Sequence, residues 1–420
     1  MNKNEPKSKY EKYTDQNELL NIQKTLAPES RLADMITVIG FVIIICFFSL
    51  FTMIYPDAEF SEQENRVLHQ KPKLTLTTLT NGQFTSEISA YFKDQFPLRN
   101  QYVGLKSTAE ILMWKQQVNG VLLGDDGNLI TRKDYPETIG LERNIHDYIL
   151  FAETMEQRGI PCSFAVAGRS MDVLTQYTPS LYTDEFSKKI WACFDSMITE
   201  KGKSYINLLT PLKTAAENGE YVYYKTDHHW TTYGAYLAYR EIMESLGGTP
   251  QSADVFTVEK ASGEFYGTTW STAGIKWIAP DTMEYYRYEG DRDYTVEIMD
   301  DGSIIDGFYD RSYLQVKDKY SSFIGGNNAY VRITKDNPES QREKLLVIKD
   351  SYAHSVIPFL AYHYDLEVLD LRYYRESPAK LVEETGVDRV LFLFNMDNIT
   401  GASPVLTALG LGLKEETGLS

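Results

Sequence analysis

Cysteine and histidine are scarce in this chain of 420 residues, which contains three cysteines and six histidines. So few thiols cannot build the disulfide framework of a small secreted domain. Cys46 lies in a long apolar stretch, which leaves only Cys162 and Cys193 as a pair. A bond between these two and two separate buried thiols are both compatible with the sequence, and the second is the more ordinary arrangement.

Positive charge is also in short supply, because 42 Lys and Arg face 59 Asp and Glu and give a net charge of -17. Nucleic-acid surfaces use clustered Lys and Arg to neutralise phosphates, and the chain has no such cluster. We therefore expect no nucleic-acid partner. The 43% hydrophobic content argues against disorder, and the 30 tyrosines on an acidic chain suit neutral sugars better than anions.

Long hydrophobic runs are absent except for residues 35–55, which contain no charged side chain. At about 1.5 Å per residue this segment is long enough to cross a hydrocarbon layer of roughly 30 Å. A signal peptide has a shorter apolar region and a small-x-small cleavage site, which the sequence after Tyr55 does not offer. We predict an uncleaved transmembrane anchor. Lysines precede it and acidic residues follow it, so residues 1–34 should form a cytoplasmic tail and the rest should lie outside.

The region after the anchor, residues 56–135, is predicted to hold a polar linker, two helices and a hairpin. Apolar residues recur at helical spacing between 81 and 116, and Phe96-Pro97 breaks the pattern into two helices. Asp126-Gly127 between apolar arms predicts a tight turn. Residues 136–420 are expected to form the main domain, with an irregular insertion containing β-strands at about 254–331.

Helices and strands alternate along this main domain. Such alternation predicts an α/β fold with a mainly parallel sheet covered by helices on both faces. The expected strands are 162–167, 205–207, 345–348, 367–370 and 389–394. The expected helices are 141–158, 186–201, 232–246, 352–364 and 378–384.

An acid, a base and a nucleophile can be placed on this framework. Asp227 and His229 are two residues apart in an extended segment, so their side chains face the same way. Ser351 follows the apolar strand 345–348 and opens a helix, which puts it at the carboxyl edge of a parallel sheet. A hydroxyl, an imidazole and a carboxylate are the groups that serine acyl transfer requires.

Two other interpretations of these residues remain open. Asp350 or Ser351 could serve only as a helix N-cap, which both residue types favour. A metal site is the second alternative, since His228, His229 and Asp227 could supply ligands together with His354 or Asp350. No His-x-x-x-His spacing and no cysteine supports it, and we expect neither a metal nor another cofactor.

Several segments resemble one family when they are taken in order. They are Ser61-Glu-Gln-Glu-Asn-Arg66, Asp94-Gln-Phe-Pro-Leu-Arg99, Asp227-His-His-Trp230, Phe323-Ile-Gly-Gly-Asn327 and Lys349-Asp-Ser-Tyr-Ala353. They resemble the blocks of the bacterial DHHW protein family, which is similar to the alginate O-acetyltransferase accessory proteins. The resemblance implies an SGNH-hydrolase-like fold in which Asp-x-His precedes the serine, with Asp227, His229 and Ser351 as a catalytic triad.

The chain departs from the usual SGNH pattern at the nucleophile, where Lys349 replaces a glycine. The candidate oxyanion donors are Ser351, Gly326 and Asn327, although Gly326-Asn327 could also be a structural turn. Four further residues are candidates for substrate binding, with a surface arginine and buried aromatics as the alternative interpretation. They are Arg169, Trp230, Tyr233 and Tyr352.

The resemblance implies an extracytoplasmic serine O-acyltransferase or acetylesterase that acts on a cell-surface polysaccharide. A transferase of this kind would need a multi-spanning membrane-bound O-acyltransferase as partner, because a single-span chain has no access to cytoplasmic acyl donors. Transfer and hydrolysis share one acyl-serine intermediate, so the sequence does not separate them. The alternative is a catalytically inactive, membrane-anchored protein that binds glycan or assists assembly.

Overall fold

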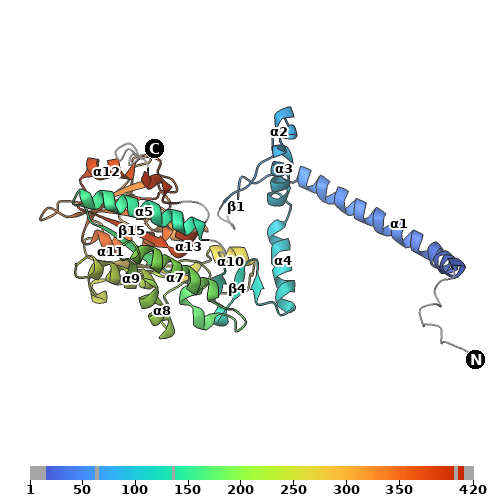
Figure 1. Cartoon of the computed structure of the whole chain (residues 1–420), viewed down its shortest axis with the longest axis horizontal. Coiled ribbons are helices and arrows are strands. Elements are labelled where there is room, and N and C mark those ends of the chain that lie inside the picture. Colours follow the sequence, from blue (N-terminus) through green and yellow to red (C-terminus); the bar gives the residue numbers. More distant parts are fainter. Residues whose placement is uncertain (1–15, 62–65, 135–137, 402–404, 411–420) are drawn as a thin grey trace, which may run out of the picture. The chain divides into compact units, whose positions relative to one another are not determined.

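The computed structural model describes residues 16–61, 66–134, 138–401 and 405–410 (Figure 1). Part of the expected tail (1–15), part of the family block at 61–66 (62–65) and the expected boundary at 135–136 lie outside the described residues. The chain divides into two compact units. One contains residues 1–61 and 67–99, and the other contains 62–66 and 100–420.

The first unit is dominated by the long helix α1 (Gln16–Ile54). The part of α1 from Arg31 to Ile54 has a mean hydropathy of 2.7. Among the described residues, α1 is the one helix that is long and apolar enough to cross a membrane. A signal sequence shares these properties. The other elements of this region are β1 (Phe60–Ser61), β2 (Arg66–Val67), α2 (Leu76–Thr80) and α3 (Gln83–Asp94).

The segment after α1 is fastened to the end of α3 by side chains. The amide of Ala58 donates to Gln95 Oε1 at 2.9 Å, and Gln95 Nε2 donates back to the Ala58 carbonyl at 2.8 Å. His69 Nδ1 lies 2.7 Å from Asp94 Oδ2. Asp94 and Gln95, the first two residues of that family block, therefore hold the segment after α1 against the end of α3.

The second unit is built on an eight-stranded sheet in the order β11-β10-β12-β14-β13-β15-β6-β7. The pairs from β14 to β7 are parallel, whereas β12, β10 and β11 join in antiparallel fashion. The parallel strands are β6 (Cys162–Ala167), β7 (Ile206–Asn207), β13 (Lys344–Lys349), β14 (Asp365–Leu369) and β15 (Arg389–Asn395). The antiparallel strands are β10 (Tyr294–Ile298), β11 (Ser303–Asp306) and β12 (Tyr330–Lys335).

Side chains alternate between the two faces of this sheet and create two cores. In β13, Leu345 and Val347 belong to one core, and Leu346 and Ile348 belong to the other. The first core includes residues of α8 (Leu209–Glu217), α9 (Thr232–Ser245) and α11 (Ile357–Ala361). The second includes residues of α5 (Ile139–Gln157), α7 (Glu185–Thr199), α12 (Pro378–Thr385) and α13 (Met396–Thr400). The predicted α/β fold with helices on both faces is thus confirmed.

Smaller elements surround the sheet. The predicted turn at Asp126-Gly127 connects two strands of a three-stranded antiparallel sheet. Its strands are β3 (Gln117–Val118), β4 (Val121–Leu123) and β5 (Leu129–Thr131). A second small sheet pairs β8 (Thr257–Phe265) with β9 (Asp281–Arg287). The remaining helices are α4 (Arg99–Leu112), α6 (Ser170–Val173) and α10 (Thr268–Ala273).

Two details differ from the sequence prediction. The helix expected over 352–364 is split into the 3-10 helix η7 (Ser351–Ser355) and the short α11, which carries Pro358 in its first turn. Proline lacks the N–H that a continuous helix would need at this position. In addition, the β10 and β11 strands of the presumed insertion are part of the central sheet.

All three cysteines, each in a described segment, carry free thiols. Cys162 and Cys193 both pack against the second core, and the disulfide weighed from the sequence is not formed. Burial raises the pKa of the Cys162 thiol to about 12, so this side chain behaves as a small apolar residue.

Candidate active site

The loop that carries Asp227 and His229 is a tight reversal between Tyr223 and Trp230. These two residues form an isolated antiparallel bridge, and the amide of Tyr224 donates to the His229 carbonyl at 3.2 Å. Thr231 then caps α9, because its hydroxyl accepts a hydrogen bond from the amide of Gly234 at 3.1 Å. The loop is therefore fixed at both ends before any partner from the sheet is added.

Asp227, His229 and Ser351 meet at the carboxyl end of β13. His229 Nε2 lies 2.8 Å from Ser351 Oγ, across 122 residues of sequence. His229 Nδ1 lies 2.5 Å from Asp227 Oδ1. Asp227 and His229 are buried, whereas Ser351 is partly exposed. The imidazole is thus held between a carboxylate and a hydroxyl that solvent can reach.

A second loop secures the carboxylate of Asp227. The amide of Thr268 donates to Asp227 Oδ2 at 2.7 Å, and its hydroxyl lies 3.1 Å from the same oxygen. Burial alone would raise the pKa of Asp227, but the imidazoles of His228 and His229 and the hydrogen bonds outweigh burial and hold the pKa below its ordinary value. The carboxylate is therefore ionised at neutral pH. Sequence reasoning did not identify Thr268 as a site residue.

An aromatic ring covers one face of the imidazole. Tyr320 stacks on His229 with ring centroids 3.9 Å apart and an interplanar angle of 10°. The Tyr320 hydroxyl lies 3.0 Å from Ser355 Oγ, so the tyrosine is tied to the same turn that carries Ser351. This stacking limits rotation of the imidazole about its side-chain bonds. Tyr320 is a second site residue that sequence reasoning missed.

His228 stays beside this arrangement, because its ring centroid lies 3.9 Å from that of His229 and its Nδ1 lies 3.7 Å from Asp227 Oδ1. The expectation that His228 faces elsewhere is wrong. His228 Nδ1 lies 2.7 Å from Thr268 Oγ1, and the side chain is 40% exposed. Desolvation and the neighbouring His229 lower the pKa of His228, so the ring is neutral near pH 7. His229 is accordingly the imidazole with a nucleophile in reach.

Asp350, and not Ser351, is the N-cap of the turn that bears the serine. Its Oδ1 accepts from the amide of Tyr352 at 2.9 Å. Its Oδ2 accepts from the amide of Asn395 and from Asn398 Nδ2, both at 2.7 Å. The carboxylate is fully buried, and burial raises its pKa. Because Asp350 takes the capping role, the hydroxyl of Ser351 is left for His229.

Lys349, which replaces the glycine of the usual SGNH pattern, is buried at the end of β13. It is the last residue of β13, and the extended backbone there has no need of glycine. Its ammonium group is 1% exposed, lies 2.7 Å from His354 Nε2 and pairs with Asp370 Oδ2 at 3.2 Å. Arg372 also pairs with Asp370, at 2.6 Å. This buried cluster joins both sides of the serine turn to β14.

The candidate oxyanion donors separate into two groups. The amide of Gly326 donates to the Phe323 carbonyl at 3.1 Å, and Asn327 Oδ1 accepts from Arg372 Nη2 at 3.1 Å. Gly326 and Asn327 thus form a structural turn, the alternative that the sequence left open. The amide of Ser351 starts η7 beside the hydroxyl itself and remains a candidate donor.

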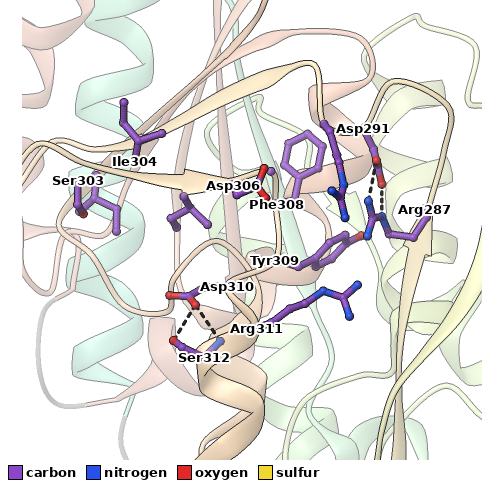
Figure 2. A pocket seen from close by; sticks show the side chains of 14 residues that line it. Arg287, Asp291, Ser303, Ile304, Asp306, Phe308, Tyr309, Asp310, Arg311 and Ser312 are labelled. Atoms are coloured by element: carbon purple, nitrogen blue, oxygen red, sulfur yellow. Dashed lines mark hydrogen bonds and ion pairs between the residues drawn. The ribbon is translucent and has the colours of Figure 1, made fainter.

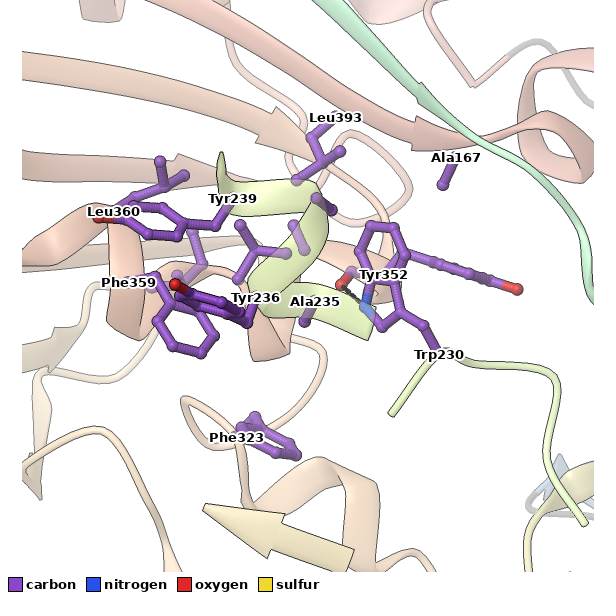
Figure 3. Close-up of a cluster of buried hydrophobic side chains, with 14 of the residues drawn as sticks. Ala167, Trp230, Ala235, Tyr236, Tyr239, Phe323, Tyr352, Phe359, Leu360 and Leu393 are labelled. Atoms are coloured by element: carbon purple, nitrogen blue, oxygen red, sulfur yellow. Dashed lines mark hydrogen bonds between the residues drawn. The ribbon is translucent and has the colours of Figure 1, made fainter. Parts of the chain in front are cut away.

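The aromatic candidates for substrate binding are placed differently from the expectation (Figure 3). Trp230 is completely buried, and its indole Nε1 donates to the Tyr352 carbonyl and to Ser355 Oγ, both at 3.0 Å. Tyr352 is 3% exposed and donates its hydroxyl to the His228 carbonyl. Both belong to the core because η7 packs directly on the loop, so neither can stack on a sugar. Tyr233 is partly exposed, and its hydroxyl donates to Glu220.

Arg169 is also a buried residue and not a surface group. Its guanidinium donates to Asp172 through Nε at 2.9 Å and through Nη2 at 2.8 Å, and Nη2 also donates to Ser187 Oγ at 3.1 Å. The side chain is 5% exposed. It follows strand β6 as predicted, but its hydrogen bonds stabilise the loop after that strand.

Asp227, His228 and His229 also offer three ligand atoms within 4.8 Å of one another. A metal ion there would have to replace the hydrogen bond between Asp227 and His229 and the one between His228 and Thr268. His354 and Asp350, named as further ligands from the sequence, are instead bonded to Lys349 and to the two asparagines. The arrangement is complete as a hydrogen-bonded triad.

A pocket of about 510 Å³ lies beside the antiparallel strands β10 and β11 (Figure 2). Two of its arginines pair with acids, because Arg287 pairs with Asp291 and with Glu259, and Arg311 pairs with Glu259 at 2.6 Å. The charges of these two arginines are therefore neutralised within the protein.

Comparison with known proteins relates the segment that carries Asp227, His229 and Ser351 to a protein family. A family model described as DHHW protein matches residues 166–369. The probable alginate O-acetylase AlgJ of Pseudomonas syringae pv. tomato is 23% identical over 170 residues, which cover 40% of this chain and 43% of the relative. The corresponding protein of Pseudomonas aeruginosa is 24% identical over 162 residues, covering 38% and 41%. The chain thus spans less than half the length of these curated relatives.

Two solved structures share the fold. A DHHW family protein from Eubacterium siraeum is 24% identical with a TM-score of 0.53, covering 70% of this chain and 95% of that one. Bacillus cereus PatB1, solved with a sulfonyl adduct, is 19% identical with a TM-score of 0.56, covering 68% and 99%.

Proposed function

Because this chain belongs to the DHHW protein family and is distantly related to the AlgJ alginate O-acetylases, we propose that it transfers or removes acyl groups on a cell-surface polysaccharide. The reaction would pass through an acyl-serine intermediate. The main domain, residues 136–420, would carry the chemistry.

One observation carries this proposal. A solvent-accessible hydroxyl lies 2.8 Å from an imidazole whose other nitrogen lies 2.5 Å from a buried carboxylate. A bond of this length lets His229 accept the proton of Ser351 as the serine attacks. The carboxylate of Asp227 fixes the tautomer with the proton on Nδ1 and stabilises the imidazolium that forms.

The reaction then follows from these roles. Ser351 Oγ attacks the acyl carbonyl carbon, and its proton moves to His229 Nε2. The tetrahedral intermediate collapses as His229 returns the proton to the leaving oxygen, which leaves an acyl-serine. A hydroxyl of the acceptor loses its proton to His229 and attacks this ester, and the proton then restores Ser351. A sugar hydroxyl as acceptor gives transfer, and water gives hydrolysis.

The apolar helix supports a membrane location for this chemistry. We propose that residues 35–55 are an anchor, that the N-terminus is cytoplasmic and that the catalytic domain is extracellular, because basic residues precede the helix and acidic ones follow it. A multi-spanning membrane-bound O-acyltransferase is the proposed donor of the acyl group in the transfer reaction.

Turnover of a small chromogenic acetyl ester by the full chain in detergent tests the proposal. Ser351→Ala should lower kcat/KM by about 10³-fold or more, since triad members act as a unit. A serine-directed phosphonate should inactivate the wild type, and mass spectrometry should locate the adduct on Ser351. The matched control is Ser312→Ala, which removes an exposed hydroxyl that is bonded to Asp310 and not to any triad residue.

A wild type without turnover on esters or acetylated polysaccharide would favour the alternative, a catalytically inactive glycan-binding or assembly protein. Turnover that survives Ser351→Ala, but is lost to chelators and restored by zinc, would favour a metal centre at Asp227, His228 and His229.

A further inference from the structure

The site needs a surface that holds the polysaccharide, and Trp230 and Tyr352 are too deeply buried to provide it. A shallow depression of about 720 Å³ lies elsewhere on the same unit. Its lining includes Tyr221, Lys225, Trp277 and Asp281. Open, shallow depressions of this size suit a segment of an extended polymer better than a small enclosed ligand.

Two aromatic rings in this depression face solvent. Trp277 is 58% exposed and Tyr221 is 42% exposed. A tryptophan is usually largely buried in a folded protein, so such exposure in a concave surface points to a ligand. The C–H groups on one face of a pyranose carry partial positive charge, and they pack on the negative face of an aromatic ring.

The tyrosine ring is held in place by a buried acid. The Asp281 carboxylate accepts a hydrogen bond from the hydroxyl of Tyr221. The same carboxylate accepts from the amide of Lys225 at 3.0 Å and from the amide of Thr226 at 2.8 Å. Asp281 is 4% exposed, so these bonds are shielded from water. The platform is therefore preorganised, which lowers the entropic cost of binding.

These bonds also connect the depression to the candidate active site. Thr226 is the residue before Asp227, and its hydroxyl lies 3.1 Å from the amide of Gly267, which packs on Asp227. The depression and the triad thus share one loop. A glycan that occupies the depression would contact the loop that carries Asp227.

The charges around the depression distinguish between classes of glycan. Asp281 is buried and bonded to its neighbours, so the charged groups that a ligand would meet are Asp126 and one amine, Lys225. Lys225 Nζ already donates to the carbonyl of Asp126 at 2.7 Å. No arginine belongs to the lining, although arginine is the side chain that best binds a carboxylate. A uronate carboxylate would therefore find only a lysine that is already bonded to a carbonyl, whereas an uncharged sugar needs no cation.

We infer that this depression is a subsite for pyranose rings of a neutral polysaccharide, with Trp277 and Tyr221 as the stacking platform. The inference rests on the proposed function for the identity of the ligand as a polysaccharide. It adds that the polymer is uncharged at this subsite, in contrast to the alginate named for the relatives.

A glycan array tests this inference with the full chain in lipid nanodiscs. The array carries neutral and uronate-containing oligosaccharides. The wild type should bind neutral oligosaccharides and leave the uronates unbound. Isothermal titration calorimetry with the strongest neutral hit should show an affinity loss of at least about 10-fold in Trp277→Ala and a smaller loss in Trp277→Phe.

The matched control is Trp114→Ala, which removes a 92% exposed tryptophan outside the depression and should bind like the wild type. Equal unfolding midpoints would exclude a folding defect in Trp277→Ala. The inference would be overturned if the array showed no neutral hits or only uronate hits. It would also be overturned if Trp277→Ala bound as tightly as the wild type. Binding needs no turnover, so Trp277-dependent binding without esterase activity would refute the proposed function and leave the subsite standing.

Discussion

Gly267 and Asp227 pack so closely that a Cβ atom on Gly267 would lie 2.2 Å from both Cβ and Oδ2 of the aspartate. The backbone of Gly267 is extended, with φ of -82°, so glycine is required there by space and not by backbone conformation. The residue that orients the candidate base is therefore positioned by a neighbour without a side chain.

Gly267→Ala should displace the Asp227 carboxylate and lower kcat/KM on an acetyl ester by about 10- to 100-fold, because a misplacement of about 1 Å can cost that much. Gly410→Ala is the control, since no atom lies within 4 Å of its added Cβ. Wild-type activity in Gly267→Ala would show that the position of Asp227 is unimportant.

The two adjacent histidines should differ sharply in their effect on activity. His229→Ala removes the group that lies 2.8 Å from Ser351 Oγ and should cost about 10³-fold or more in kcat/KM. His228→Ala removes a ring bonded to Thr268 and should cost less than about 10-fold. Steady-state kinetics of both variants checks this. Equal losses would contradict the assignment of His229 as the base.

Asp350→Ala should destabilise the fold because it leaves two buried amides, of Tyr352 and Asn395, and the partly buried Asn398 Nδ2 without their acceptor. We expect a loss of about 2–4 kcal/mol in the free energy of unfolding. Asp310→Ala removes an exposed cap of the 3-10 helix Arg311–Gln315 and should cost about 1 kcal/mol or less. Urea unfolding of the two variants gives the comparison.

Stability should fall as the pH drops below about 6.5 because of His354. Burial and the Lys349 ammonium hold the pKa of His354 well below its ordinary value. The folded chain therefore stays unprotonated while the unfolded chain takes up a proton, and this group alone lowers the free energy of unfolding by up to about 1.4 kcal/mol per pH unit. The stability contribution is complete above pH 6.5 and is lost below it.

Urea unfolding between pH 5 and 8 measures this slope. His354→Gln should reduce the slope by the share of this one group, because the pKa values of His228 and His363 are also lowered. His146→Gln, which replaces a histidine with a side chain 77% exposed, should keep the wild-type slope. An unchanged slope in His354→Gln would mean that other groups govern the acid sensitivity.

The proposed topology predicts that protease added to intact cells digests the large domain. The N-terminal tail should be cleaved only after the membrane is opened, because its lysines hold it on the cytoplasmic side. Antibodies against each end follow the fragments. Resistance of the large domain in intact cells would reverse the orientation.

Local sequence patterns determined the elements of this protein. The strand predicted over 162–167 has those bounds in the structure, and the strand predicted over 389–394 extends by one residue. Their continuous apolar character and the intervening amphipathic helices reflect burial on both faces, which the sequence records directly. The spacing of Asp227 and His229 likewise predicted which histidine is braced by the carboxylate, although His228 Nδ1 also lies 3.7 Å from it.

Tertiary structure alone decided what surrounds these residues. The stacking of Tyr320 on His229, the contact of Gly267 with Asp227 and the bonds from Asp350 to Asn395 and Asn398 join segments 40 or more positions apart. Local periodicity contains no information about such pairs, because they depend on how the sheet brings its loops together. For the same reason the sequence left open whether Trp230 and Tyr352 bind substrate or are buried, and the structure places both in the core, whereas Trp277 is exposed.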